Sequence, residues 1–382
     1  MITNASRHVK TILFSCLPLL VLLAMGEILI FMTGADKPRL YTKGFIGTEF
    51  VRYDPELLWS MCPGSRRVDK RGTVYTINEH GLRSPSLVPK KTTEFRILSL
   101  GESSTFGIGV ADNETYSALL EQALNQRSPR HRYRVINAGA SAYSSTQSVR
   151  YLERRGLVLQ PDAVLFYHEI NDYLPTTIRD LGNNEIGITM TDAQLMSSLP
   201  FRINGLLFGL SGIYRFAFLS FVRSRIQSFD WQHFQSPFPG IGLADMPLAV
   251  PTILDATTHT PMATGGNVYF RRVSNTERLQ NFEKLLALCT SRNIRLVIMH
   301  PSYRRTQRHE CLLTDFCHRH ELPLFETYDI LHPSDPGRAA QMFLDEFHPT
   351  AEGHRRLAEA LADFLAPVAC LNHPLSNSAH PR

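Results

Sequence analysis

Two groups of residues, far apart in the chain, contain the side chains that nucleophilic catalysis needs. Ser103 follows the apolar run Arg96–Leu100 and stands close to Gly101, so a buried strand ending there would present the serine hydroxyl at the edge of a sheet. Asp345 precedes His348 by three residues, so its carboxylate can reach the Nδ1 of the ring within one turn of chain. Each group alone has an ordinary explanation, because serine after glycine is common in loops and Asp345 with His348 could form a surface ion pair.

Two further turns follow apolar runs and carry groups suited to a developing negative charge. The run Tyr133–Ala138 ends at Gly139, where the absence of a side chain lets the backbone N–H approach a substrate oxygen. The run Ala163–Tyr167 ends in polar residues that include Asn171, whose amide can donate to the same oxygen. The structural alternatives are a tight strand-to-helix turn at Gly139 and a helix or turn cap at Asn171.

Taken together, the four groups resemble, in order and spacing, the sequence blocks of SGNH/GDSL hydrolases. The matching blocks are Gly101-Glu102-Ser103, Asn137-Ala138-Gly139, Asn171-Asp172 and Asp345-Glu346-Phe347-His348. The resemblance covers about residues 96–366, excluding a long insertion between the third and fourth blocks. It implies that Ser103 is the nucleophile and that His348, oriented by Asp345, is the base. It also implies an oxyanion hole formed by the N–H groups of Ser103 and Gly139 and the amide of Asn171, with no metal ion and no cofactor.

The third and first blocks each depart from the family pattern. Glu102 replaces the usual aspartate, so the hydrogen bonds around the nucleophile turn must be rearranged. Glu169 occupies a position where the family usually has glycine, and with His168 it places two titratable groups beside the predicted oxyanion hole. They are either variation within the family or contacts to a polar substrate.

These residues must be positioned by the elements that end beside them. From residue 95 onward, apolar runs alternate with helical segments, which indicates a mainly parallel sheet covered on both faces. The expected strands are Arg96–Leu100, Tyr133–Ala138, Ala163–Tyr167, Ile294–Met299 and Leu322–Phe325, and the expected helices are Thr115–Gln126, Ser144–Gly156, Asn275–Arg292 and Thr350–Leu365. Active sites of such sheets lie beyond the carboxyl ends of the strands, where the blocks fall. The predicted fold is α/β, a three-layer α/β/α sandwich, and the resemblance implies its flavodoxin-like SGNH form.

The N-terminal segment predicts a transmembrane helix. Ile12–Thr33 is apolar over about the twenty residues that a spanning helix needs, and Glu27 lies near its end, where a charge costs less. Basic residues before the run favour an N-terminus held inside and an extracytoplasmic catalytic domain, although further basic residues follow it. A cleaved signal peptide with small residues at Ala24 and Gly26, or a buried helix, is the alternative. Because apolar residues continue to Met32, we favour a single-pass, uncleaved anchor.

We expect four regions along the chain. Residues 1–33 form the anchor, residues 34–94 a stalk or linker that packs on the catalytic domain, residues 95–370 the SGNH domain with an insertion at about 175–273, and residues 371–382 a disordered tail. Within the insertion, Phe201–Ile226 is rich in Phe, Leu and Gly. It is either a helix pair packed on the domain or an apolar lid or membrane-resting surface. Arg215 and three glycines argue against a second spanning helix.

Composition excludes several classes of protein. The chain has 382 residues, of which 43% are hydrophobic and 20% charged, values typical of a globular protein with a core. The net charge of +5 is small and the basic residues are scattered, which argues against nucleic-acid binding. Six cysteines are too few for a disulfide framework, and none has metal-site spacing. Cys311 and Cys317 are either a pair or two thiols on one helix face.

The resemblance therefore implies a membrane-anchored serine esterase or acylhydrolase whose substrate is an ester of a lipid, a glycan or a small alcohol. An O-acyltransferase or acetyl esterase acting on a glycan or lipid would use the same residues. A non-catalytic, membrane-tethered binding module is the third possibility, and the presence of all four blocks argues against it.

Overall fold

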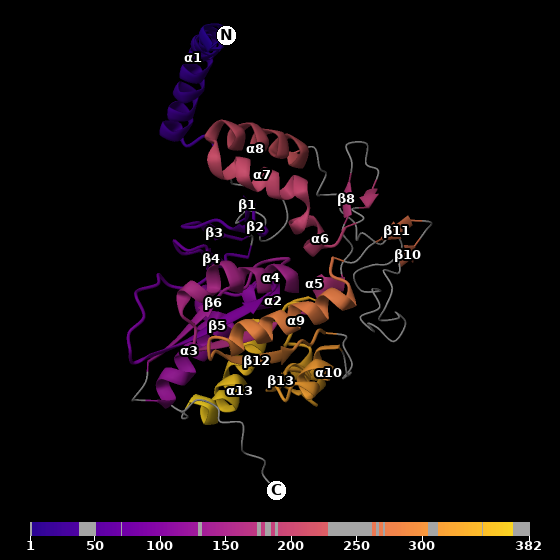
Figure 1. Ribbon diagram of the computed structural model, residues 1–382. Coiled ribbons are helices and arrows are strands. Elements are labelled where there is room, and N and C mark those ends of the chain that lie inside the picture. The colour runs from indigo at the N-terminus through magenta and orange to yellow at the C-terminus, as the bar shows by residue number, and fades with distance from the viewer. Residues whose placement is uncertain are drawn as a thin grey trace.

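A five-stranded parallel sheet forms the centre of the chain (Figure 1). The computed structural model describes residues 2–37, 51–69, 71–128, 132–173, 177–179, 185–187, 190–227, 262–264, 267–269, 272–304, 312–345 and 347–369. The strands are β5 (Glu94–Gly101), β6 (Arg132–Asn137), β7 (Ala163–Tyr167), β12 (Arg295–His300) and β13 (Leu324–Glu326). Across the sheet they run β6, β5, β7, β12, β13, and every neighbouring pair is parallel. Numbered along the chain this order is 2-1-3-4-5, the flavodoxin-like order, so the predicted fold is confirmed.

Helices cover both faces of this sheet (Figure 1). They are α3 (Tyr116–Arg127), α4 (Ser145–Tyr151), α9 (Asn275–Thr290), α10 (Leu312–Arg319) and α13 (Ala351–Ala369). Alternate residues of a strand point to opposite faces. Leu98 and Phe166 therefore pack in one cluster with Phe282 of α9, while Leu165 packs in the other with Leu361 of α13. Burial on both faces explains why the central strands read as continuous apolar runs.

The predicted elements are present with small differences at their ends. The expected helix Ser144–Gly156 is the exception, because α4 ends at Tyr151 and the chain continues as a π-helical segment, Leu152–Gly156. Gly156 lies against the sheet there, and a Cβ at this position would come within 2.9 Å of Leu98 Cδ2. A larger residue would push the segment away from β5.

The described part of residues 34–94 packs closely on the α/β domain. It forms two antiparallel hairpins, β1 (Val51–Asp54) with β2 (Leu58–Met61) and β3 (Arg66–Val68) with β4 (Val74–Thr76). Leu57 and Leu82 belong to the same core cluster as β5 and β7. The buried Asp54 carboxylate accepts hydrogen bonds from both terminal nitrogens of Arg155, at 2.7 and 2.9 Å.

The described part of the insertion is mainly helical. It contains α6 (Asp192–Ser197), the helix pair α7 (Leu199–Leu210) and α8 (Gly212–Gln227), and two small antiparallel pairs, β8 (Thr177–Arg179) with β9 (Glu185–Gly187) and β10 (Met262–Thr264) with β11 (Asn267–Tyr269). The predicted helix pair is thus present. Tyr53 of β1 holds it, with its ring centroid 5.0 Å from that of Phe208 and 4.9 Å from that of Phe218. The predicted tail, residues 371–382, lies outside the described residues.

The N-terminal helix α1 (Ile2–Thr33) extends away from the rest of the chain and contacts α8 (Figure 1). Its segment Phe14–Thr33 is long and apolar enough to be a membrane span or a signal sequence, and this segment is not buried in the protein.

The end of β5 leaves no room for a side chain at Gly101. A Cβ there would lie 2.0 Å from Thr105 Oγ1 and 2.8 Å from the carbonyl oxygen of Tyr167. Gly209, within α7, has no atom within 4 Å of the corresponding position. We predict that Gly101→Ala lowers the free energy of unfolding by about 1–3 kcal/mol through overpacking. Gly209→Ala should be neutral or slightly stabilising, because alanine favours the helix. Thermal and denaturant unfolding of the two variants measures this, and equal stability of both would contradict the packing described.

Candidate active site

The turn after β5 positions Ser103 at the carboxyl edge of the sheet. Ser103 begins α2 (Ser103–Phe106), a single helical turn that ends at Gly107, whose φ of 86° suits glycine. The Asn137 side chain, at the end of β6, donates to the carbonyl of Thr105 at 2.8 Å. The Thr105 hydroxyl also bonds the Tyr116 hydroxyl at 3.0 Å. These contacts hold the turn while leaving Ser103 partly exposed.

The loop before α13 carries the predicted acid and base. Phe343 and Pro349 pair as an isolated bridge, and the N–H of Leu344 donates to the His348 carbonyl at 2.8 Å. Inside this narrow loop, Asp345 Oδ1 accepts the backbone N–H of His348 at 2.9 Å. The loop therefore holds the Asp345 carboxylate and the His348 ring on the same side of the loop before any substrate binds.

The structure brings Ser103, His348 and Asp345 into one hydrogen-bonded line. His348 Nε2 lies 2.8 Å from Ser103 Oγ, and His348 Nδ1 lies 2.8 Å from Asp345 Oδ2. Partial burial raises the pKa of Asp345, but the hydrogen bond and charge of His348 and two backbone N–H groups outweigh burial and hold the pKa at about 2. Asp345 is therefore ionised at neutral pH, and it favours the tautomer in which Nδ1 carries the proton and Nε2 can accept one.

Ser104, next to Ser103, has a different environment. It is buried, with 2% of its surface exposed, and its hydroxyl donates to the carbonyl of Phe347 at 3.2 Å. This bond joins α2 to the loop that carries His348. Ser104 thus fastens the two halves of the site together, whereas the Ser103 hydroxyl faces the base.

Two of the three predicted oxyanion donors, those of Gly139 and Asn171, already make hydrogen bonds in the structure. The N–H of Gly139 donates to Asn137 Oδ1 at 2.9 Å, and a Cβ on Gly139 would lie 2.4 Å from the backbone nitrogen of Phe106. Glycine is therefore required there by its packing against α2. Asn171 Nδ2 donates to the carbonyl of Tyr143 at 3.0 Å, which uses one of the two N–H groups of the amide. Roles for Gly139 and Asn171 in binding an oxyanion stay predictions.

Glu102 is buried beside Ser103, the predicted nucleophile. Its carboxyl group accepts the backbone N–H of Asn171 at 3.2 Å and the hydroxyl of Tyr303 at 3.1 Å. Burial raises the pKa of Glu102 to about 8, and the nearby carboxyl groups of Asp172 and Glu169 add to this, against the opposing effect of the two hydrogen bonds. Glu102 is consequently neutral at pH 7 and adds no negative charge beside Ser103.

Two residues that support this region could not be recognised from the sequence. Tyr303 links Glu102 to the chain after β7, because its hydroxyl also accepts the N–H of Ile170 at 3.0 Å. Arg278 of α9 is fully buried and pairs with Asp172, with Nε 3.2 Å from Oδ2. Both come from segments more than a hundred residues away, and an isolated tyrosine or arginine has no local pattern that would reveal such a role.

Three buried histidines, His168, His300 and His354, have partners other than Ser103. His168 is completely buried and its Nε2 bonds the hydroxyl of Ser148 at 2.7 Å; its contact with a substrate stays a prediction. Glu169 is also buried, and its contact with a substrate stays a prediction. His300, at the end of β12, is buried and pairs with Glu326 at 2.9 Å. His354 of α13 is fully buried, and its ring accepts the N–H of Tyr116 at 3.1 Å.

Within the described ranges, no group of three or more His, Cys, Asp or Glu side chains is arranged to hold a metal ion. Cys311 lies outside the described residues, so its pairing with Cys317 stays open.

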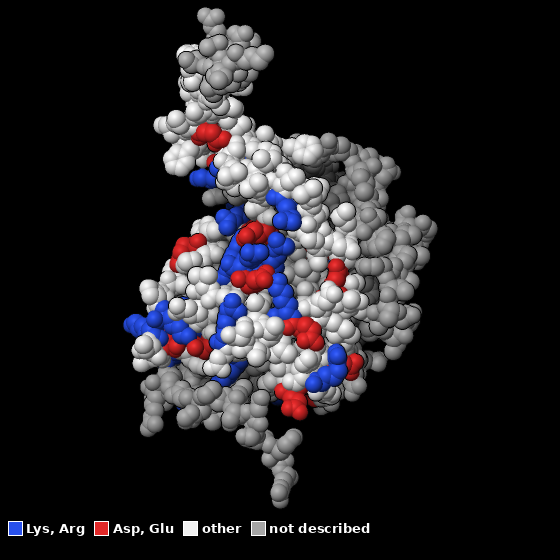
Figure 2. Space-filling view, viewed as in Figure 1, with Lys and Arg blue, Asp and Glu red and all other residues white. Residues whose placement is uncertain are grey.

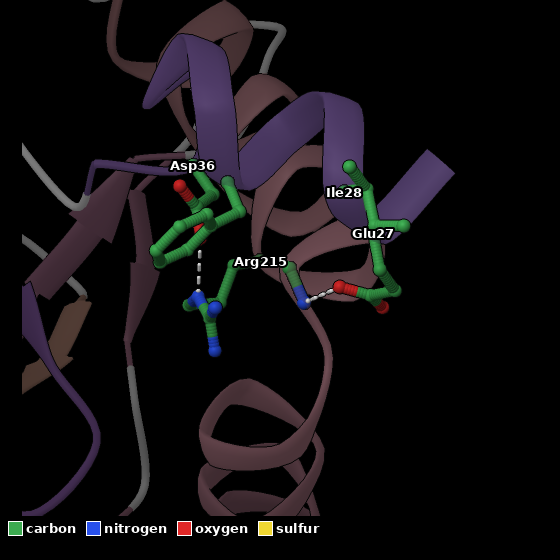
Figure 3. Close-up of a pocket in the computed structure, with 6 residues that line it drawn as sticks. Glu27, Ile28, Asp36 and Arg215 are labelled. Carbon is green, nitrogen blue, oxygen red and sulfur yellow. Dashed lines mark hydrogen bonds and ion pairs between the residues drawn. The ribbon is translucent and has the colours of Figure 1, made fainter. Parts of the chain in front are cut away.

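A pocket of about 310 Å³ lies far from this site, between α1 and α8, and is lined by residues that include Ile28 and Arg215 (Figure 3).

No family model matches the sequence, and a search of curated proteins gives no match. Among solved structures, the chain is similar to an alpha/beta hydrolase from the metagenome of Lake Arreo, with 18% identity and a TM-score of 0.39 over 73% of this chain and 97% of that chain. It is also similar to the lipase/acylhydrolase from Enterococcus faecalis (13% identity, TM-score 0.38, 72% and 96% of the chains) and to an acetyl xylan esterase (11%, 0.39, 71% and 100%). Because these values are low, the similarities carry no argument about the activity of this chain, and the α/β fold described above rests on the order and direction of its own strands.

The neutral state of Glu102 predicts an alkaline limit to activity. Above a pH of about 8 the Glu102 carboxyl loses its proton, and the new negative charge beside Ser103 would oppose the charge that develops during attack. We expect kcat/KM of the wild type to fall as pH rises through about 8. Glu102→Gln keeps a carbonyl acceptor but cannot ionise, so its activity should persist to higher pH. An unchanged alkaline limb in Glu102→Gln would show that another group is responsible.

Proposed function

We propose that this chain is a membrane-anchored serine esterase of the SGNH/GDSL type, which cleaves a carboxylic ester through an acyl-enzyme. The proposal rests chiefly on one observation, the line from Ser103 Oγ through His348 to Asp345 with both hydrogen bonds at 2.8 Å. A hydroxyl, an imidazole and an ionised carboxylate in this geometry form the arrangement that activates a serine nucleophile.

In the first half of the reaction, Ser103 Oγ attacks the acyl carbon while His348 Nε2 takes its proton. The imidazolium then carries a proton on each nitrogen, and the carboxylate of Asp345 stabilises the one on Nδ1. The bond from the acyl carbon to the alcohol oxygen breaks, and His348 returns its Nε2 proton to the leaving alcohol. Ser103 is left as an ester of the acyl group.

In the second half, water takes the place of the alcohol. His348 removes a proton from the water as its oxygen attacks the acyl carbon, and the bond to Ser103 Oγ breaks as the serine recovers its proton. The products are a carboxylic acid and the free enzyme. If a sugar or lipid hydroxyl replaced the water, the same steps would give acyl transfer.

The oxyanion formed in both halves needs donors beside Ser103. We assign this role to the N–H groups of Ser103 and Gly139 and to the Asn171 amide. The second N–H of the Asn171 amide can serve without loss of its bond to Tyr143. Gly139 would have to release Asn137, to which its N–H donates at 2.9 Å, when the substrate binds.

We place the α/β domain outside the cytoplasm, tethered by α1 as an uncleaved span. The apolar segment Phe14–Thr33 supports a span, and the basic residues before it support an N-terminus held inside. The ester itself belongs to a lipid, a glycan or a small molecule in this setting.

We predict that Ser103→Ala lowers kcat for ester cleavage by at least about a thousandfold, because loss of a serine nucleophile removes the covalent route. Wild type and variant should be compared on acetyl, short-chain and long-chain esters, with the acid product and any acyl-alcohol product analysed. Acid alone supports hydrolysis, and an acylated sugar or lipid would support transfer.

Ser104→Ala is the matched control for this variant. It removes a hydroxyl that bonds Phe347 and costs about 1 kcal/mol of stability. It keeps the Ser103 hydroxyl and the contacts of the loop that hold His348, so its activity should fall far less than that of Ser103→Ala. A fluorophosphonate probe should label the wild type and Ser104→Ala and fail on Ser103→Ala. Labelling that persists in Ser103→Ala and disappears in Ser104→Ala would overturn the assignment of the nucleophile.

We further predict that the protein stays with membranes after high-salt and alkaline washes and keeps its N-terminus. A helix with the hydropathy of Phe14–Thr33 leaves the bilayer only when the bilayer is dissolved. Intact-mass analysis of the washed membrane fraction tests this, and protease accessibility of the α/β domain tests the orientation. A mature N-terminus near Glu27 would instead identify a cleaved signal peptide.

A further inference from the structure

The helix pair α7–α8 presents an apolar stripe to solvent. Five residues of α7 are exposed, between 39% and 74% of their surface: Leu199, Ile203, Leu206, Leu207 and Leu210. Their spacing places them on one face of the helix. The opposite face is occupied, because Phe208 is buried against Tyr53. The stripe therefore belongs to a helix that is packed on its other side. Such a contiguous row of exposed apolar side chains is unusual for a surface that faces water.

Contacts with α1 place this pair beside the segment that we propose to span the membrane. The Glu27 carboxylate of α1 accepts the Ser211 hydroxyl at 2.6 Å and the backbone N–H of Gly212 at 2.7 Å, at the beginning of α8 (Figure 3). Arg215 of α8 pairs with Asp36, just after α1, at 2.8 Å. These bonds also explain why an acidic residue is tolerated in an apolar helix, because a carboxylate at membrane depth must be paired.

Small residues let the two helices approach closely. A Cβ at Gly26 would lie 3.0 Å from Ile213 Cδ1, and one at Gly212 would lie 2.8 Å from Glu27 Oε2. Close contact between backbones through glycine is a common way for helices to pack in membranes. The junction of α1 and α8 is thus built for a specific contact.

The position of Glu27 sets the depth of the pair. Glu27 precedes Thr33, the end of the apolar segment, by six residues. At the rise of an α-helix this separation is about 9 Å. If Thr33 lies at the edge of the hydrocarbon, the start of α8 must reach about that depth to bond Glu27, which matches the roughly 5–10 Å to which interfacial helices sink.

Charge favours a lipid surface over a second protein copy as the occupant. Residues 193–227 contain four arginines and no Asp or Glu. In Figure 2 the coloured charged side chains gather over the body of the molecule, whereas the described part of α1 and the helix pair shows mainly uncharged residues, apart from groups at the α1–α8 contact. Apolar residues accompanied only by basic ones suit the boundary between headgroups and acyl chains of an anionic membrane.

We propose that the α7–α8 pair is seated in the membrane interface beside α1, with the stripe of α7 in contact with acyl chains. This inference rests on the proposed anchor. It makes the body of the protein lie against the bilayer in a fixed orientation, because Tyr53 of β1 and Glu27 of α1 hold the pair from both sides.

The test uses the full chain in vesicles of phosphatidylcholine and phosphatidylglycerol, with and without bromine on the acyl chains. Bromine quenches tryptophan only at short range. A tryptophan is added at the stripe (Leu206→Trp), in α1 (Leu22→Trp) or at a distant exposed position (Val158→Trp, where valine is 78% exposed), and the wild-type signal is subtracted. We expect loss of fluorescence in brominated vesicles for Leu22→Trp and Leu206→Trp but not for Val158→Trp.

The outcomes separate this proposal from the anchor. Quenching of Leu22→Trp without quenching of Leu206→Trp would leave the anchor intact and overturn the seating of α7. Quenching of neither would overturn both. If Leu206→Trp resists bromine and the protein forms cross-linked dimers through this face, the occupant is a second copy and the proposal is wrong. Adding Glu27→Ala to Leu206→Trp should reduce its quenching while quenching of Leu22→Trp is retained, and no reduction would overturn the role of Glu27.

Discussion

The hydrogen bond between His348 Nε2 and Ser103 Oγ forms only if almost every part of the α/β domain keeps its position. The two residues are 245 positions apart, yet their atoms must stay 2.8 Å apart. A parallel sheet meets this demand because the carboxyl ends of its strands lie at one edge. Ser103 follows the interior strand β5 after one residue, Glu102. His348 is held by its own narrow loop and by the bond between the Ser104 hydroxyl and the Phe347 carbonyl. Loss of that alignment by an ångström would remove most of the benefit of preorganisation.

The second constraint is electrostatic. Three carboxyl groups, those of Glu102, Glu169 and Asp172, are buried within a short stretch of the sheet edge. Burying like charges together is costly unless each is neutralised or paired. Asp172 has the buried Arg278 as its partner, and Glu102 keeps its proton. Neutral Glu102 can then accept the backbone N–H of Asn171 without adding a charge beside the nucleophile.

Local patterns account for what the sequence could predict. The apolar runs of β5 and β7, buried on both faces, and the stripe of α9 are repetitive features, so the strands and principal helices were recognisable. Ser103, Asp345 and His348 were recognisable because their neighbours form short blocks. By contrast, the burial and hydrogen bonding of His168 and His354 depend on residues from other elements, Ser148 and Tyr116. Nothing adjacent in the sequence distinguishes a buried histidine from an exposed one at a helix or strand end.

Glu27 likewise could not be interpreted from its neighbours in the sequence. Its contacts in the structure connect α1 with the α/β domain. In the sequence it is an unfavourable charge in an apolar helix. In the structure it is the cap of α8, because its carboxylate satisfies N–H groups that have no partner within that helix. The charge of Glu27 and the unsatisfied N–H groups at the start of α8 therefore compensate each other only when α1 and α8 are in contact. Since α7 is joined to α8 and packs on Tyr53, this single pairing transmits the position of α1 to β1 and to the domain that carries Ser103. A carboxylate that looks unfavourable in the sequence of α1 is thus the group that gives α1 a defined orientation relative to the site.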